Sequence, residues 1–548
     1  METGSKLSRR SFIAGAGIAL AGLGLTGCGQ PKTKGEAKAE LSNTGDIAWD
    51  EEVDFLVVGS GTAALGALAA TEAEDAKVML IDKADVMFGG TSATSGGGFW
   101  IPMNYLQAGE GVSDSREAAI SYVSGCAAGR APEAAIEAFV DHAGAWLERT
   151  HELTGVEFMI GGAQDYYDNV DGYLERGRNS KIKSGNAGEL WQAVQKLLEE
   201  RGCDIRMGTA LKSLVTADDG AVIGVIAEKG SDTVAIKAGA VLLGTGGFDH
   251  NPEMMREHIT APVYVTNAAE ANTGDGHRAA AKIGAKLTLM STYWGLPAFF
   301  PGAPGSFDPA GDVVFDTTFN DWNTFRVKPH SLVVNAQGHR FGDETTMYPV
   351  FTRGWGNYDS GSFSYNNAPA FFVCDSNYIS KYNLPGMGEG DTEPTAECFV
   401  KADSLSELAT KLGIDPEGLE TEVNRLNQFA AEGVDGDFHR GEKTSSKTMF
   451  LSQVDEPNLK NPLLGDVAQP PFYGALYVPA MCGTSGGMQI NENAQVVDTE
   501  GNPIAGLYAC GNCAAAISGG AYLGGGGTLG PGCTMADIAA RHALGLQA

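Results

Sequence analysis

Glycine backbone and a tyrosine hydroxyl stand together near the C-terminus of the chain. The segment Gly519–Gly532 is dominated by glycine and carries one aromatic hydroxyl, that of Tyr522. A backbone with so few side chains lets a flat ligand contact main-chain N–H groups directly. The segment therefore predicts a cofactor-binding loop, and the alternative is a plain glycine-rich loop at the surface.

Nine cysteines are a second candidate for chemistry. Cys510 and Cys513 form a C-x-x-C pair, and Cys482 and Cys533 lie nearby in sequence, so four thiolates could bind zinc or an iron–sulfur cluster. The pair lies where a strand turns into a loop and the backbone is already committed, which favours a structural role. We therefore expect no metal site, with the iron–sulfur cluster as the alternative.

Regular elements must position the glycine segment. The apolar run Leu507–Ala509 predicts a buried strand that stops at Gly511-Asn512, and a helix is expected from about Cys533. The N-terminus of that helix presents the positive end of its dipole, which suits an anion or a developing negative charge. Cofactor contacts are expected at Gly511, Asn512 and Leu529.

A dinucleotide-binding unit opens the globular part of the chain. A predicted strand leads into a turn with Gly59 and Gly61, a helix follows from Ala64, and the next predicted strand ends at Asp82. In this arrangement Gly59 makes the turn, Gly61 admits the pyrophosphate and Ala64 allows close packing. Asp82 is expected to bind the ribose hydroxyls.

A second loop rich in glycine and hydroxyl groups, residues 89–102, identifies the cofactor class. It lies where a two-nucleotide cofactor continues past its pyrophosphate, and NAD would not need it. The sequence therefore predicts non-covalent FAD. Besides the dinucleotide motif, the expected contacts are Gly90, Thr91, Ser92, Ser95, Gly97, Gly246 and Asp275.

Composition bounds the class of protein. The chain has 548 residues, of which 75 are glycine and 43% hydrophobic, and its net charge is −30. That charge argues against nucleic acid and anionic membrane surfaces as partners. We expect an α/β fold, with a Rossmann-like FAD-binding domain and an inserted α+β substrate (cap) domain. The predicted divisions are a signal at 1–28, a linker at 29–50, the first FAD-binding part at 51–289, the insertion at 290–465 and the second FAD-binding part at 466–548.

The N-terminal residues predict a targeting signal rather than part of the folded domain. Ser8–Ile13 carries an arginine pair typical of a twin-arginine export signal, and an apolar run too short for a comfortable membrane span follows. Leu25–Cys28 is similar to a lipobox with Cys28 as the lipidated residue. The protein is therefore expected to be exported and anchored outside the cytoplasm by lipid on Cys28.

From Val53 onward the chain resembles the FAD-dependent fumarate reductase and ketosteroid dehydrogenase flavoproteins. The resemblance rests on GSGTAALGA, GGTSATSGGGFWIP, GTGGF with NTGDG, and the C-terminal CGN, GGGGTLGP and ARHA. Fumarate reductases clamp a dicarboxylate with two arginines and a histidine, and those places are Tyr348, Tyr522 and Gly483 here. The chain is therefore most similar to the branch of ketosteroid delta-one dehydrogenases and steroid-enone reductases. It departs from that branch in the Tyr-Leu-Gly-Gly-Gly that begins at Tyr522, where the family has Tyr-Pro-Gly-Pro-Gly.

The resemblance implies a catalytic set. Tyr522 and the Gly526 N–H would hold a substrate carbonyl, and Tyr348 would transfer a proton, relayed by Tyr166. The implied reaction moves hydrogen across the C–C bond alpha,beta to a ketone of a hydrophobic, steroid-like enone. Because the sequence predicts an exported lipoprotein and contains no C-x-x-C-H haem motif, we expect a separate membrane or haem carrier to exchange electrons, which favours reduction. The alternatives are a reductase of a small unsaturated acid and a flavin-bearing electron-transfer or binding lipoprotein without turnover.

Overall fold

The computed structural model describes residues 47–547. The predicted export signal, Cys28 and nearly all of the linker 29–50 lie outside these residues and stay predictions. Within residues 47–547, no helix is both long enough and apolar enough to cross a membrane.

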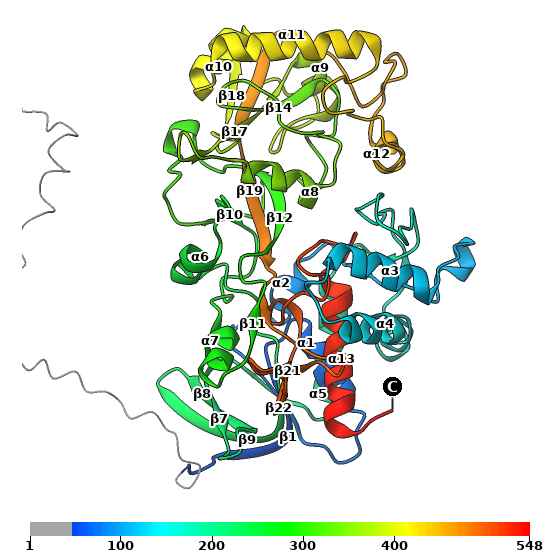
Figure 1. Ribbon diagram of the computed structural model, residues 1–548, viewed down its shortest axis with the longest axis vertical. Coiled ribbons are helices and arrows are strands. Elements are labelled where there is room, and N and C mark those ends of the chain that lie inside the picture. Colours follow the sequence, from blue (N-terminus) through cyan, green and yellow to red (C-terminus); the bar gives the residue numbers. More distant parts are fainter. Residues whose placement is uncertain (1–46, 548) are drawn as a thin grey trace, which may run out of the picture. The chain divides into compact units, whose positions relative to one another are not determined.

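A largely parallel sheet carries the dinucleotide-binding unit (Figure 1). Strands β22, β9, β1, β2 and β6 lie side by side and parallel in that order. The apolar residues of β1 and β2 are buried, as expected for strands covered on both faces. The strands of this sheet are β1 Glu51–Val58, β2 Val78–Asp82, β6 Asp204–Met207, β7 Thr209–Thr216, β8 Val222–Lys229, β9 Asp232–Leu243, β21 Gln495–Val497 and β22 Pro503–Ala509.

The antiparallel pairs β7–β8 and β8–β9 form the meander that the alternating pattern between Asp204 and Ile236 predicts. Helices and a small sheet of β3, β5 and β4 accompany the large sheet. They are α1 Ala63–Ala70, α2 Gly90–Ala93, β3 Gly98–Trp100, η3 Ala108–Glu110, α3 Arg116–Ala127, α4 Glu133–Thr154, β4 Phe158–Ile160, β5 Asn179–Ile182, α5 Gly188–Glu200, α6 Pro252–His258, α7 Asp275–Lys282, η7 Gly511–Cys513 and α13 Leu529–Leu544.

Helix α13 begins at Leu529, earlier than the predicted start at Cys533. Pro531 is compatible with a first turn, because the N–H groups there have no partner within the helix. Gly530 is also needed in that turn, since a Cβ on it would lie 2.2 Å from the Trp100 carbonyl oxygen. Gly530, predicted from the sequence to lie in a loop, therefore lies in the first turn of a helix that closely approaches Trp100.

A second sheet of seven strands is centred on β19, Phe472–Thr484. Its other strands are β10 Val265–Thr266, β12 Tyr293–Phe299, β13 Val314–Phe315, β14 Ser331–Asn335, β17 Ala370–Cys374 and β18 Phe399–Ala402. Because β10 and β19 belong to it, this sheet reaches beyond the predicted insertion, residues 290–465, at both ends. A continuously apolar strand such as β19 carries no sequence signal that says which of two sheets it joins.

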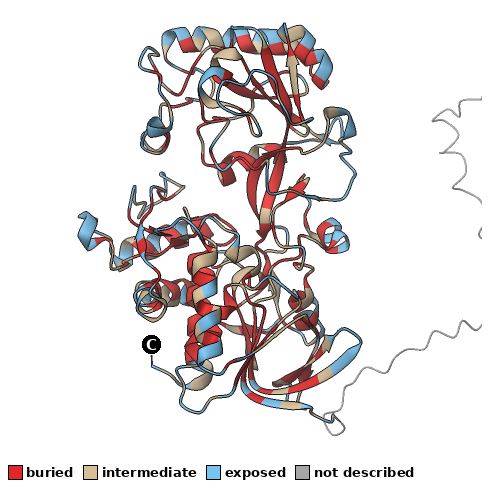
Figure 2. Ribbon diagram, turned by 180° about the vertical axis from the view of Figure 1, so that it is seen from behind, coloured by how far each residue is buried: buried red, intermediate tan, exposed pale blue. Residues whose placement is uncertain are grey.

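Helices and short segments complete the region of the second sheet. Figure 2 shows helix α11 exposed along its outer side, while the strands beneath it are buried. These elements are η4 Pro304–Ser306, α8 Tyr348–Phe351, η5 Thr352–Gly356, α9 Ser376–Tyr382, α10 Leu405–Leu412, α11 Pro416–Glu432, α12 Thr444–Phe450 and η6 Leu451–Gln453, with the strand pairs β15 Tyr358–Asp359 and β16 Ser364–Tyr365, and β11 Leu287–Thr288 and β20 Gly487–Met488.

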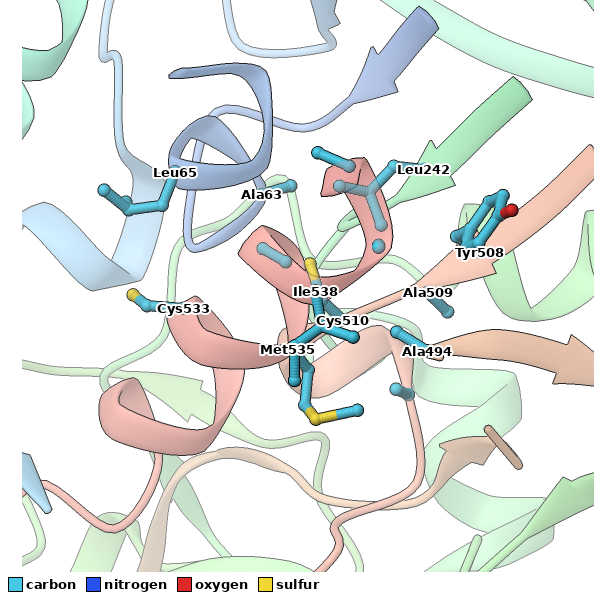
Figure 3. Packing of buried hydrophobic residues seen from close by; sticks show 14 of the residues in the cluster. Ala63, Leu65, Leu242, Ala494, Tyr508, Ala509, Cys510, Cys533, Met535 and Ile538 are labelled. Atoms are coloured by element: carbon cyan, nitrogen blue, oxygen red, sulfur yellow. The ribbon is translucent and has the colours of Figure 1, made fainter. Parts of the chain in front are cut away.

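Helix α1 packs directly on α13. A Cβ on Gly66 would lie 2.6 Å from Leu242 Cδ2 and 2.7 Å from the Ala536 carbonyl oxygen, so only glycine allows this approach. Figure 3 shows the surrounding apolar packing, with labelled side chains from α1, from β9, from the turn before β21, from β22 and the residue after it, and from α13: Ala63, Leu65, Leu242, Ala494, Tyr508, Ala509, Cys510, Cys533, Met535 and Ile538. This contact packs the middle of α13 against α1, the helix that follows the dinucleotide turn.

Candidate active site

The dinucleotide turn lies at the carboxyl ends of the parallel strands. Gly59 has φ +109°, and a Cβ on it would lie 2.2 Å from the Gly244 carbonyl oxygen in the turn after β9. A Cβ on Gly61 would lie 3.3 Å from Ser92 Oγ, so Ser92 faces this turn. The Trp191 indole N–H donates to the Gly61 carbonyl oxygen at 3.0 Å and fixes the turn from helix α5. Ala64 is fully buried at the start of α1.

Ser60 joins the predicted ribose-binding residue to the turn. Its backbone N–H and its hydroxyl donate to Asp82 Oδ2 at 2.7 and 2.6 Å, and its oxygen accepts from the Gly89 N–H at 2.9 Å. The sequence motif does not single out Ser60. One buried hydroxyl thus fixes Asp82, the glycine turn and the entrance to α2 together, and the predicted ribose contact stays a prediction.

The second glycine and hydroxyl loop forms helix α2 and the turn after it. Thr91 Oγ1 accepts from the Ala269 N–H at 2.8 Å, and Ser95 Oγ accepts from the Gly97 N–H at 3.3 Å. These hydroxyls therefore hold neighbouring backbone and still have a proton to donate. Around Gly90, space within 4 Å is open to an added Cβ.

Asp275 begins helix α7 and is paired rather than free. It contacts Lys83 Nζ at 2.6 Å and Arg278 at 2.7 Å. Burial raises the pKa of Asp275, but the hydrogen bond and charge of Lys83 outweigh it and lower that pKa below its ordinary value. Gly246, before this helix, has φ +71° and approaches Asn272, as a Cβ on it would lie 2.3 Å from Asn272 Oδ1.

The C-terminal strand-turn faces the same edge. Asn512 Oδ1 accepts from the Trp294 indole N–H at 2.9 Å, which connects η7 to the second sheet. Gly511 has φ +61° and lies against Thr62, and Leu529 is the first residue of α13. Glycine turns, an acid at the end of β2 and helix starts at α1, α7 and α13 therefore meet at one edge, and these residues fit FAD.

Three predicted catalytic tyrosines form one cluster. The ring centroids of Tyr166 and Tyr348 are 5.7 Å apart, those of Tyr166 and Tyr522 5.8 Å, and those of Tyr348 and Tyr522 5.5 Å. Tyr166 comes from the loop between β4 and β5, Tyr348 begins α8, and Tyr522 lies in the glycine segment. Trp294 packs on Tyr522 at 5.4 Å and Trp322 on Tyr348 at 5.1 Å between ring centroids.

Burial keeps these phenols neutral. It raises the pKa of Tyr166 to about 12 and is the largest cause of the raised pKa values of Tyr348 and Tyr522. Tyr348 and Tyr522 are 6% and 7% exposed and belong to the apolar core of the second sheet. The tyrosines therefore start as proton donors.

Gly526, the predicted carbonyl-binding position, lies on the glycine segment against β3. It has φ +85°, and a Cβ on it would lie 2.3 Å from the Phe99 nitrogen. Its carbonyl oxygen accepts from the Trp100 N–H at 3.0 Å. The glycine is thus required by the close approach of β3, and the substrate contact of its own N–H stays a prediction.

The four cysteines of the metal alternative do not converge. Cys510, Cys513 and Cys533 belong to the core of the large sheet, whereas Cys482 lies on β19 and packs against the apolar core that contains Tyr348 and Tyr522. Burial raises the pKa values of Cys482 and Cys510 to about 12 and that of Cys513 to about 11, so these sulfurs stay thiols. Among residues 47–547, no group of three or more His, Cys, Asp or Glu side chains could hold a metal ion.

Known proteins share the sequence and this arrangement. A family model described as an FAD binding domain matches residues 54–529. The 3-oxosteroid 1-dehydrogenase of Mycobacterium tuberculosis is 30% identical over 575 residues, which cover 90% of this chain and 98% of that protein. The 4-oxocyclohexanecarboxylate 2-dehydrogenase of Sinomonas cyclohexanicum is 30% identical over 552 residues, which cover 90% of this chain and 93% of that protein.

A solved structure agrees with these relatives. The crystal structure of 3-ketosteroid delta1-dehydrogenase from Sterolibacterium denitrificans, in complex with 1,4-androstadiene-3,17-dione, matches with a TM-score of 0.80 and 25% identity, covering 90% of this chain and all of that chain. The predicted family, α/β flavoenzyme fold and FAD cofactor are thereby confirmed. This chain belongs to the FAD-binding family of ketosteroid dehydrogenase-like flavoproteins and is an FAD-dependent oxidoreductase that acts on CH–CH groups.

Proposed function

We propose that this enzyme transfers hydrogen across the C–C bond alpha,beta to a ketone of a hydrophobic ring substrate, steroid-like in size. The observation that carries the proposal is the cluster of neutral tyrosines formed by buried Tyr348 and Tyr522 in an apolar core and half-buried Tyr166 packed against it. Such a cluster can donate hydrogen bonds and a proton to an uncharged carbonyl compound. The names of both relatives, which are dehydrogenases of oxo ring compounds, support the same class.

Each protein group has its own role in the proposed reaction. The Tyr522 hydroxyl and the Gly526 N–H hold the carbonyl oxygen as it gains enolate character. Tyr348 transfers the proton at the alpha carbon, and Tyr166, whose ring contacts both other tyrosines, relays it. The glycine turns at Gly59 and Gly61, with Asp82, would hold FAD, which would supply hydride exchange at the beta carbon. Because all three phenols start protonated, the arrangement favours the reductive direction.

A dicarboxylate substrate fits this cluster poorly. The places that hold arginines in fumarate reductases are the buried Tyr348 and Tyr522, and the place of the histidine is Gly483. Gly483 has φ +136°, and a Cβ on it would lie 2.4 Å from Asn512 Nδ2. A side chain at position 483 would therefore displace Asn512, and a second carboxylate would be buried without a counter-charge.

We further propose that the enzyme is exported by the twin-arginine route, is anchored by lipid on Cys28 and exchanges electrons with a separate membrane or haem carrier. The motifs at Arg9-Arg10 and Leu25–Cys28 support the first two parts. Twin-arginine export carries folded proteins, which suits a flavoprotein that must acquire its cofactor first. Because the sequence contains no C-x-x-C-H haem motif, we expect the flavin to exchange electrons with a separate carrier.

An anaerobic titration tests the function. Photoreduced holoenzyme is mixed with a steroid enone, a monocyclic enone and fumarate, and flavin reoxidation is followed by absorbance with product identification. We expect stoichiometric reoxidation by an enone and the saturated ketone as product. Reoxidation by fumarate instead would favour the small-acid reductase, and reaction with redox dyes alone would favour an electron-transfer protein.

A further inference from the structure

We propose that Tyr122 is a positioning residue whose hydroxyl fixes the Tyr166 loop against the Tyr522 loop. Tyr122 lies on helix α3 and is 0% exposed. No sequence motif singles it out. The inference rests on the proposed function, because it concerns the relative placement of tyrosines that this function uses.

The hydroxyl of Tyr122 contacts both loops. It donates to the Leu523 carbonyl oxygen at 2.7 Å and accepts from the N–H groups of Tyr166 at 2.9 Å and Tyr167 at 3.2 Å. A phenol has one proton to donate and limited acceptor capacity. In Tyr122 these hydrogen bonds go to backbone atoms at or next to Tyr166 and Tyr522, the two proposed catalytic residues.

The base of the Tyr166 loop is held separately. Asp165 Oδ1 accepts from the Trp100 indole N–H at 2.7 Å, and Asp165 Oδ2 pairs with Arg178 at 2.7 Å. Arg178 is in turn paired with Asp114 at 2.6 Å. These contacts tie Asp165 to β3 and to the residue before β5. The hydrogen bonds of Tyr122 and the Tyr166 N–H to Leu523 oxygen bond at 3.0 Å join this loop to the Tyr522 loop.

The ring of Tyr122 is held independently of its hydroxyl. It stacks on Trp100 with centroids 6.0 Å apart, and the Arg178 guanidinium lies 5.6 Å from its centroid. Removing the oxygen alone therefore leaves the ring in place and loosens the junction of the two loops, which keeps the Tyr166 N–H to Leu523 oxygen bond. Displacements of about 1 Å can cost on the order of 100-fold in rate when reacting groups must align.

The test compares Tyr122→Phe with Tyr378→Phe in the holoenzyme. Tyr378 is also 0% exposed and its hydroxyl donates to a backbone oxygen, that of Phe325 at 3.1 Å, but it lies in the core of the second sheet away from the cluster. We expect both variants to bind flavin. Hydrogen exchange should rise in residues 163–174 and 519–528 only for Tyr122→Phe, and its single-turnover rate with an enone should fall by roughly 10- to 100-fold.

A double substitution separates positioning from general destabilisation. If Tyr122 acts through the two loops, adding Tyr122→Phe to Tyr166→Phe should lower the rate less than it does in the wild type. Unchanged exchange in both loops, equal behaviour of the two single variants, or fully independent rate effects would each overturn the proposal. If the wild-type enzyme turns over no ketone or enone, the proposed function fails, and the exchange measurement alone decides whether Tyr122 joins the loops.

Discussion

At the scale of single residues, the proposed chemistry depends on phenols kept neutral by burial. Tyr348→Phe removes one oxygen from a side chain that is 6% exposed, so the fold and the flavin should be retained. We expect the hydride step to slow by roughly two to four orders of magnitude, the usual contribution of a general acid. Tyr522→Phe removes one carbonyl donor and should cost on the order of 100-fold. Stopped-flow single turnover measures both.

The matched control for these variants is Tyr473→Phe. The hydroxyl of Tyr473 donates to the Thr392 carbonyl oxygen at 2.9 Å, far along the second sheet from the cluster. Tyr473→Phe should leave the single-turnover rate unchanged. All variants should reduce artificial dyes normally, because electron transfer to a dye needs no substrate proton. Near-normal rates in Tyr348→Phe and Tyr522→Phe would mean that these tyrosines only fill the core.

A second prediction at this scale concerns Gly483. Gly483→Ala introduces a Cβ 2.4 Å from Asn512 Nδ2 at a φ of +136°, so strain and a clash combine. We expect the free energy of unfolding to fall by more than the ~1–3 kcal/mol that strain alone costs. Flavin affinity should fall with it, because Asn512 is displaced from Trp294. Thermal unfolding and flavin release measure the two effects.

The control for Gly483→Ala is Gly501→Ala. Gly501 also has a positive φ, +92°, but an added Cβ there meets nothing within 4 Å. It should cost stability through strain alone and leave flavin binding intact. Equal effects of the two substitutions would show that Asn512 adjusts freely and that position 483 does not shape the site.

At the scale of elements, the loop at residues 453–469 is fastened to the second sheet through His330. Its Nδ1 lies 2.7 Å from the Asp466 carbonyl oxygen and its Nε2 3.4 Å from Glu456 Oε1. Burial lowers the pKa of His330, but the hydrogen bonds to Asp466 and the charges of Asp375 and Glu456 outweigh it, so that pKa is raised.

A raised pKa fixes the sign of the pH dependence. The protonated imidazole adds stability below the unfolded pKa of about 6.5, and this contribution is lost as pH rises through the higher folded value. We expect His330→Gln to lower the free energy of unfolding at pH 5.5 and to matter less at pH 8.5. His439→Gln is the control, because His439 also lies beside a carboxylate, Glu442, but is 67% exposed. A loss that grows with pH would contradict the assignment.

The elements around the cofactor follow closely from sequence, whereas the joining of loops does not. Gly59, Gly61 and Asp82 lie between a strand, a helix and a strand, and local pattern is enough to predict such a unit. The contacts of Ser60, Gly66 and Tyr122 depend on elements distant in sequence. Local periodicity carries no information about which backbone atoms a buried hydroxyl or a glycine will meet.

At the scale of the whole molecule, the division of the chain between two large sheets likewise depends on contacts between segments distant in sequence. The apolar run of β19 predicts a buried strand, but its pairing with β12, β17 and β18 decides that it belongs to the second sheet. The proximity of Tyr166, Tyr348 and Tyr522, each on a different segment, follows from resemblance and from the fold rather than from spacing.

The targeting prediction also belongs to the whole molecule. Replacing Arg9 and Arg10 by lysine should leave folded, flavin-loaded protein in the cytoplasm, because the twin-arginine route recognises the arginine pair. Cys28→Ser should be exported without lipid. Cell fractionation with mass spectrometry of the N-terminus measures both. Normal lipidation of the lysine variant would rule out the twin-arginine route.

We propose that this flavoenzyme reduces the C–C bond beside an uncharged ring ketone and discriminates against dicarboxylates. The most direct measurement is anaerobic stopped-flow reoxidation of the reduced holoenzyme by a steroid enone and, separately, by fumarate. Because a buried, unpaired carboxylate costs about 3–5 kcal/mol, we predict that the enone reacts on the order of 1,000-fold faster or more. Equal rates, or faster reoxidation by fumarate, would contradict the account.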